Sequence, residues 1–111
     1  MFANKYKLDN IIGFVDRNFL QTDGNSEDVM PLEPLKPKWE SFGWRVYEID
    51  GNDLNQVIDT IEKAKKEKGK PVMIIARTIK GKGVSFMENV ASWHGTPPAK
   101  EDFDRAIKEL N

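Results

Sequence analysis

Residues that could bind a metal ion, a phosphate or a proton occur at three places in this sequence. At the first place, Asp16 and Asn18 follow a short apolar run. A carboxylate and an amide carbonyl both offer oxygen to a hard cation such as Mg²⁺, so this pair is a candidate metal site. The alternative is that the two residues only shape a turn after a strand, which is a common role of Asp and Asn.

The second place is a stretch of glycine and lysine at residues 80–83 (KGKG). Glycine allows backbone N–H groups to close on a phosphate, and lysine adds positive charge. The stretch matches neither the P-loop pattern nor the glycine pattern of dinucleotide-binding folds. A solvated, flexible turn is therefore the alternative interpretation.

The third place is His94, the only histidine, which stands between Trp93 and Gly95. Histidine transfers protons near neutral pH and binds anions when it is charged. Neither Ser85 nor Ser92 shows a pattern that would join His94 in a nucleophilic triad. The alternative is a surface histidine whose ring is hydrogen-bonded to the backbone.

Alternating strands and helices must position these residues. The sequence predicts strands at residues 11–16, 44–49 and 72–76, and helices at 35–42, 54–68 and 103–110. This order indicates an α/β fold, a mainly parallel sheet with flanking helices. Ligands gather at the carboxyl ends of the strands in such sheets. The long connections after the first and third strands should therefore leave the sheet at one edge and bring the three places together.

The helices and their flanks supply apolar residues for the core. One face of the central helix carries four apolar residues, namely Leu54, Val57, Ile58 and Ile61. Asn52 or Asp53 can cap the start of this helix, because a short side-chain oxygen accepts hydrogen bonds from the free N–H groups there. Three aromatic residues near the second strand are expected in the core: Trp39, Phe42 and Trp44.

Composition excludes several classes of protein. The 111 residues suffice for one domain, and 17 basic against 18 acidic residues argue against binding nucleic acid or an anionic membrane by charge. The absence of cysteine excludes disulfide scaffolds, zinc-thiolate sites, iron–sulfur clusters and catalytic cysteines. Residues 1–9 lack the apolar core of a signal peptide, and no apolar run is long enough to span a bilayer. We therefore expect a cytoplasmic protein.

Four blocks of this sequence resemble transketolases and occur in the same order as in that family. The blocks are residues 6–24 (YKLDNIIGFVDRNFLQTDG), 38–44 (KWESFGW) followed by 50–53 (DGND), 77–89 (RTIKGKGVSFMEN), and 93–95 (WHG). The resemblance covers nearly the whole chain. It is strongest to the split bacterial form, in which the N-terminal subunit carries only the thiamine diphosphate domain.

This resemblance implies thiamine diphosphate and Mg²⁺ as cofactors, and transfer of a two-carbon ketol unit between sugar phosphates as the reaction. By position, Asn18 would bind Mg²⁺ through its side-chain oxygen, and Leu20 would bind it through the backbone carbonyl. Ile79 would lie beside the cofactor. His94 would act as a catalytic residue near the cofactor diphosphate and the sugar.

The chain departs from the family pattern because it lacks the Gly-Asp-Gly that opens the diphosphate and magnesium motif, and because it has no pyrimidine-binding domain. The resemblance therefore implies one partial domain over residues 1–111, the C-terminal part of the diphosphate-binding domain. Its partners would be the remaining transketolase domains or subunit, within an oligomer.

We expect such a chain to be inactive alone and to bind Mg²⁺ weakly, since Mg²⁺ normally requires a carboxylate or phosphate ligand. We also expect self-association or dependence on the missing half, because an exposed sheet edge invites pairing. Two other hypotheses stay open. One is a non-catalytic module that binds a phosphorylated ligand or cofactor, and the other is an interaction piece that completes another chain.

Overall fold

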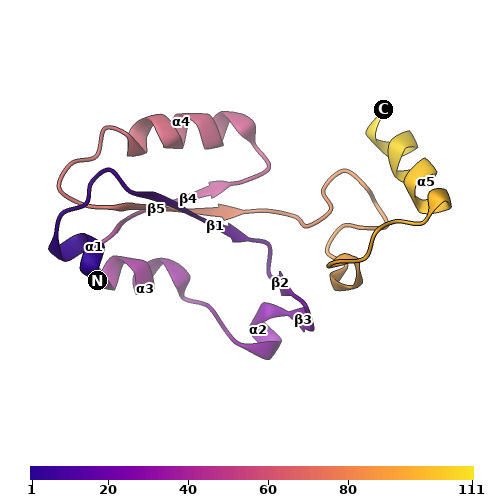
Figure 1. Cartoon of the computed structure of the whole chain (residues 1–111), viewed down its shortest axis with the longest axis horizontal. Helices are drawn as coiled ribbons and strands as arrows, with labels where there is room; N and C mark the ends of the chain where they lie inside the picture. Colours follow the sequence, from indigo (N-terminus) through magenta and orange to yellow (C-terminus); the bar gives the residue numbers. More distant parts are fainter. The chain divides into compact units, whose positions relative to one another are not determined.

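A three-stranded parallel sheet is the centre of the computed structural model, which describes residues 1–111. Its strands are β1 (Ile12–Arg17), β4 (Arg45–Asp50) and β5 (Val72–Arg77), in the spatial order β1-β5-β4 (Figure 1). The predicted α/β fold with a parallel sheet is confirmed, and each strand lies within one residue of its predicted bounds. The central strand, β5, is buried at every residue except its last, as expected for a strand covered on both faces.

The chain divides into two compact units. The first unit, residues 1–17 and 32–78, holds the sheet together with α1 (Phe2–Lys5), α3 (Leu35–Ser41) and α4 (Leu54–Ala64). The second unit, residues 18–31 and 79–111, holds β2 (Leu20–Gln21), β3 (Gly24–Asn25), α2 (Ser26–Val29), the 3₁₀ turn η1 (Ala91–Trp93) and α5 (Lys100–Leu110). The assignment of residues 1–111 to one partial domain stays a prediction.

Two apolar clusters, one on each face of the sheet, form the core of the first unit. On one face, α4 packs Ala64 against Val72 and Ile74 of β5. On the other face, α3 contributes Trp39 to a cluster that includes Met73 of β5. Figure 1 shows α4 and α3 on opposite sides of the sheet. The strand β5 therefore supplies the centre of both clusters.

The helix α4 begins where the sequence predicts, and its predicted apolar face meets the sheet in part, since Ile61 packs against the core and Val57 is half-buried. The side chain of Asp53 caps it by accepting hydrogen bonds from the backbone N–H groups of Asn55 and Gln56. Leu54 and Ile58 are exposed, whereas the buried residues of the helix are Thr60 and Ala64. The helix also ends at Ala64, earlier than predicted, just before two consecutive lysines.

The predicted core position of Phe42 is wrong, because this side chain is 45% exposed. Phe42 follows the last turn of α3, and the chain reverses there at Gly43, whose φ is +86°. A Cβ at Gly43 would lie 2.1 Å from the Asn4 side-chain nitrogen, so the turn needs glycine for both conformation and space. Trp39 and Trp44 do pack on the core, and their rings meet edge to face at 5.2 Å.

Residues 17–34 are not the irregular connection that their composition suggests. β2 and β3 pair as a short antiparallel hairpin that turns at Thr22 and Asp23. The one-turn helix α2 follows, and the side chain of Asn25 caps it by accepting the N–H of Glu27. The sequence does not predict α1 either, because all these elements are too short for a hydrophobic period to reveal them.

None of the helices has both the length and the apolar character that crossing a lipid bilayer requires.

A buried arginine links the end of β1 to the start of α3. The Arg17 side chain is almost fully buried, and its Nε donates to Glu33 Oε1 at 3.0 Å. The other oxygen of Glu33 accepts the backbone N–H of Leu35 at 2.9 Å. This N–H and the Arg17 guanidinium together lower the pKa of Glu33 below its ordinary value of 4.5. The ion pair therefore holds the carboxyl end of β1.

We expect Ile74→Val to lower the free energy of unfolding by about 0.5–1.5 kcal/mol, because it deletes a methyl group from a fully buried side chain. The control is Ile58→Val on α4, where the side chain is 58% exposed and the change should stay within about 0.5 kcal/mol. Urea denaturation measures both. Equal effects of the two substitutions would contradict the assigned core.

We expect Glu33→Gln to destabilise the chain at neutral pH and to lose this effect in acid. Since the folded state lowers the pKa of Glu33, its ionised form contributes stability above the ordinary value of 4.5, and this contribution disappears as the pH falls through the lowered folded-state value. Thermal melts of both proteins at several pH values between neutral and strongly acidic test this. A difference between them that grows on acidification would refute it.

Candidate functional site

The carboxyl ends of the three strands lie level with one another. In the register of the sheet, Arg17 of β1 and Asp50 of β4 both pair with Arg77 of β5. The N–H of Gly51 donates to the Arg77 carbonyl, and the N–H of Thr78 donates to the Arg17 carbonyl. The two long connections therefore leave β1 and β5 at the same edge, as the sequence predicts.

Asp16 has a partner in the neighbouring strand end. Its carboxylate accepts a hydrogen bond from the Thr78 hydroxyl, which lies one residue beyond β5. This contact joins β1 to β5 at the carboxyl edge. No group of three or more His, Cys, Asp or Glu side chains is arranged to hold a metal ion.

Asn18 forms a tight turn directly after β1. Its side-chain oxygen accepts the backbone N–H of Leu20 at 2.9 Å, and Phe19 between them has a φ of +61°. The turn keeps the amide oxygen of Asn18 close to the backbone of Leu20. Both the amide oxygen and the Leu20 carbonyl are hard donors of the kind that Mg²⁺ prefers. The donor set fits Mg²⁺ in kind but is incomplete, because neither oxygen carries charge and Mg²⁺ takes six ligands.

The glycine and lysine stretch at residues 80–83 is a structured turn that closes on itself. Gly81 has a φ of +73°, and a Cβ there would lie 2.7 Å from the Met87 carbonyl oxygen. The N–H of Gly83 donates to Glu88 Oε1 at 3.0 Å, and the Lys82 ammonium lies 3.7 Å from the same oxygen. A carboxylate of this chain thus occupies the donors that could hold a phosphate. Residues 81–83 are exposed in this turn, so the interpretation as a solvated turn stays open.

Lys80 and Lys82 look equivalent in the sequence but have different surroundings in the structure. Lys82 pairs with Glu88, whereas Lys80 is half-buried and its ammonium forms no ion pair or hydrogen bond. Ile79, which the resemblance places beside the cofactor, is also half-buried and accepts the N–H of Lys82 through its carbonyl. Only side-chain contacts, which spacing does not reveal, single out Lys80 as the unpaired cation of this stretch.

His94 follows η1 with its ring free. Its backbone N–H donates to the Ala91 carbonyl at 2.8 Å, but its imidazole is exposed and makes no hydrogen bond. The preceding Trp93 is anchored, since its Nε1 donates to the Phe86 carbonyl at 3.2 Å. The exposed position fits the interpretation as a surface histidine, although the ring itself makes no hydrogen bond to the backbone. A free imidazole is available to move a proton or to bind an anion.

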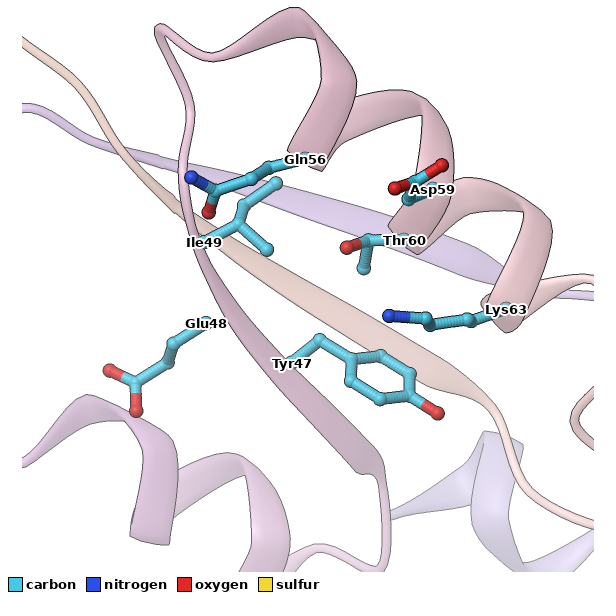
Figure 2. A pocket seen from close by; sticks show the side chains of 7 residues that line it. All are labelled: Tyr47, Glu48, Ile49, Gln56, Asp59, Thr60 and Lys63. Carbon is cyan, nitrogen blue, oxygen red and sulfur yellow. The ribbon is translucent and has the colours of Figure 1, made fainter.

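An open pocket of about 260 Å³ lies between β4 and α4 (Figure 2). Figure 2 shows Gln56, Thr60 and Lys63 of α4 on one side, with Tyr47 and Ile49 of β4 opposite them. Glu48 also lines the pocket, but its carboxylate points away from α4. None of the residues predicted for the site lines this pocket, so it adds no chemistry to the carboxyl edge.

A family of known proteins matches almost the whole chain. The family is described as transketolase, thiamine diphosphate binding domain, and the match runs over residues 1–110. An apulose-4-phosphate transketolase subunit of Phocaeicola vulgatus is 41% identical over 111 residues, covering all of this chain and 40% of that protein. The 6-deoxy-6-sulfo-D-fructose transketolase subunit SqwG of a Clostridium species is 44% identical over 110 residues, covering 99% of this chain and 40% of that protein.

Solved structures of transketolases superpose closely on this chain. The transketolase of Campylobacter jejuni superposes with a TM-score of 0.90 at 32% identity, covering 98% of this chain and 17% of that one. The transketolase of Leishmania mexicana gives a TM-score of 0.89 at 27% identity, with 98% and 16% coverage. The chain spans about two fifths of the length of the curated relatives described here. The family match and the structural superpositions agree. The chain belongs to the transketolase family, as part of its thiamine diphosphate binding domain.

Proposed function

We propose that this chain supplies part of a thiamine diphosphate and Mg²⁺ site in a transketolase that moves a two-carbon ketol unit between sugar phosphates. Asn18 would hold Mg²⁺ through its side-chain oxygen and Leu20 through its backbone carbonyl. His94 would lie by the cofactor diphosphate and the sugar, and Ile79 would contact the cofactor. This assignment agrees with the family to which the chain belongs.

The turn at Asn18 is the observation that carries the proposal. The hydrogen bond from the Leu20 N–H to Asn18 Oδ1 keeps the amide oxygen beside the Leu20 backbone, just beyond a strand at the carboxyl edge. A preformed turn loses less conformational freedom on binding than a flexible segment would.

The role of His94 follows from its free ring. An exposed imidazole with no partner can donate to a diphosphate oxygen or exchange a proton with a substrate hydroxyl. Bound thiamine diphosphate would provide the reactive carbon for two-carbon transfer, a chemistry that protein side chains lack. The part of this chain is then to orient the cofactor and to stabilise charge on it.

Groups outside this chain would have to supply the remaining Mg²⁺ ligands. Two neutral oxygens leave most of the Mg²⁺ coordination to diphosphate, water and a carboxylate beyond this chain. We therefore propose that the other transketolase domains or a second subunit complete the site, within an oligomer in the cytoplasm, and that the chain alone is inactive. Two relatives named as transketolase subunits support a partner of this kind.

The proposed substrates are sugar phosphates. One relative's name carries a sugar 4-phosphate and another's a sulfo sugar. Both are sugars with an anionic group, and this class is the one that the proposal requires. As an unpaired cation, Lys80 would attract such anions.

We expect the full 111-residue chain to bind thiamine diphosphate saturably in calorimetric titration, and only when Mg²⁺ is present. Asn18→Ala and His94→Ala should each weaken binding by roughly tenfold, because each removes one contact to metal or anion. Asn55→Ala, an exposed asparagine on α4, is the matched control and should bind like the wild type.

Two results would overturn the proposal. Binding that is indifferent to Mg²⁺ or to Asn18→Ala would remove the metal assignment. No binding by a chain that circular dichroism shows to be folded would favour the hypothesis of an interaction piece that completes another chain.

A further inference from the structure

We propose that the C-terminal helix α5 positions His94, and that Arg105 and Glu109 are positioning residues for it. Glu109 acts through Ser85, and Arg105 acts through a short aromatic pair, on the loop that precedes the histidine. The role of His94 toward the cofactor and the sugar rests on the proposed function, but the contacts that position it do not. These contacts lie within residues 79–111 of the second unit.

The first contact between α5 and the loop is made by Glu109. One of its carboxylate oxygens accepts the backbone N–H of Ser85 at 2.5 Å, and the other accepts the Ser85 hydroxyl at 2.9 Å. These two bonds lower the pKa of Glu109 below its ordinary value, so the carboxylate is charged at neutral pH. Hydrogen bonds to a charged acceptor are stronger than bonds between neutral groups. The helix is thus tied to the loop at two atoms of a single residue.

The second contact is made by Arg105, one turn earlier on α5. Its guanidinium carbon lies 4.2 Å from the centroid of the Phe86 ring. The same ring meets the Trp93 ring edge to face, with centroids 5.9 Å apart. Trp93 also donates its indole N–H to the Phe86 carbonyl. Arg105, Phe86 and Trp93 therefore form a continuous stack from the helix to the residue before His94.

A single hydrogen bond of its own holds His94. Its ring has no hydrogen bond, and its backbone N–H is tied only to Ala91 within η1. The place of the ring follows from the place of Trp93, which the stack determines. We call the four residues Ser85, Phe86, Arg105 and Glu109 the α5 clamp. Loosening the α5 clamp should let the His94 loop sample more conformations.

Because the chain has one histidine, its imidazole gives a single set of NMR signals. We would record histidine ring signals of the full chain for the wild type, Glu109→Gln and Arg105→Met. The matched controls are Glu101→Gln and Lys108→Met, which change exposed residues on the same helix that do not touch the clamp. Arg105→Lys tests rescue, since lysine keeps the positive charge near Phe86.

We expect the His94 ring signals to move toward unfolded-histidine positions, or to broaden, in Glu109→Gln and Arg105→Met. The controls should match the wild type, and Arg105→Lys should lie between. Affinity for thiamine diphosphate with Mg²⁺ should fall by roughly three- to tenfold in the two clamp variants, about the effect of one lost hydrogen bond. A merely stabilising role would change the melting temperature without changing the His94 signals.

The proposal is overturned if the Ser85 amide signal moves in Glu109→Gln, which shows that the clamp is broken, while the His94 signals stay unchanged. Should Glu109→Gln unfold α5, Ser85→Ala removes one hydroxyl bond only and decides the question in the same way. If the His94 signals respond to the clamp variants but wild-type chain fails to bind thiamine diphosphate, the proposed function fails and the α5 clamp stands.

Discussion

The parallel pairing of β5 with β1 on one side and β4 on the other is the constraint on which the rest of the first unit depends. Because all three strands run in one direction and are in register, their carboxyl ends coincide at Arg17, Asp50 and Arg77. A strand covered on both faces must be apolar throughout, and β5 is apolar up to its last residue. Both core clusters then form around it, and α3 and α4 occupy the two faces.

This arrangement also decides how polar residues at the edge are used. Asp16, on a sheet strand, forms a hydrogen bond with Thr78 that joins two strand ends. Asn18, just beyond the strand, is outside the ladder and forms a local turn with Leu20. Two residues that look equivalent as oxygen donors in the sequence thus have different roles, and the difference follows from a separation of two positions along the chain. The ion pair of Arg17 lies between them and holds the strand end in place.

Much of the first unit could be predicted from the sequence because its elements depend on local patterns. The apolar run of β5 and the Asp53 cap of α4 need no knowledge of tertiary contacts. The exposure of Phe42 follows from the reversal of the chain at Gly43, and the exposure of Leu54 and Ile58 depends on tertiary packing that periodicity does not contain. The occupation of the Gly83 amide by a carboxylate of the same chain depends on a turn that folds back on itself.

The two main candidate site residues, Asn18 and His94, are positioned by different contacts, so substitutions in different parts of the chain affect them. Asn18 is placed by β1 and by its own turn, so its position depends on the sheet. His94 is placed by the stack from α5, whose contacts lie within residues 79–111. Changes to the turn that follows β1 therefore act on Asn18, and changes on α5 act on the loop that carries His94. Under the proposed function, substitutions on α5 would alter the part of the site near the sugar while leaving the proposed metal ligand Asn18 unchanged.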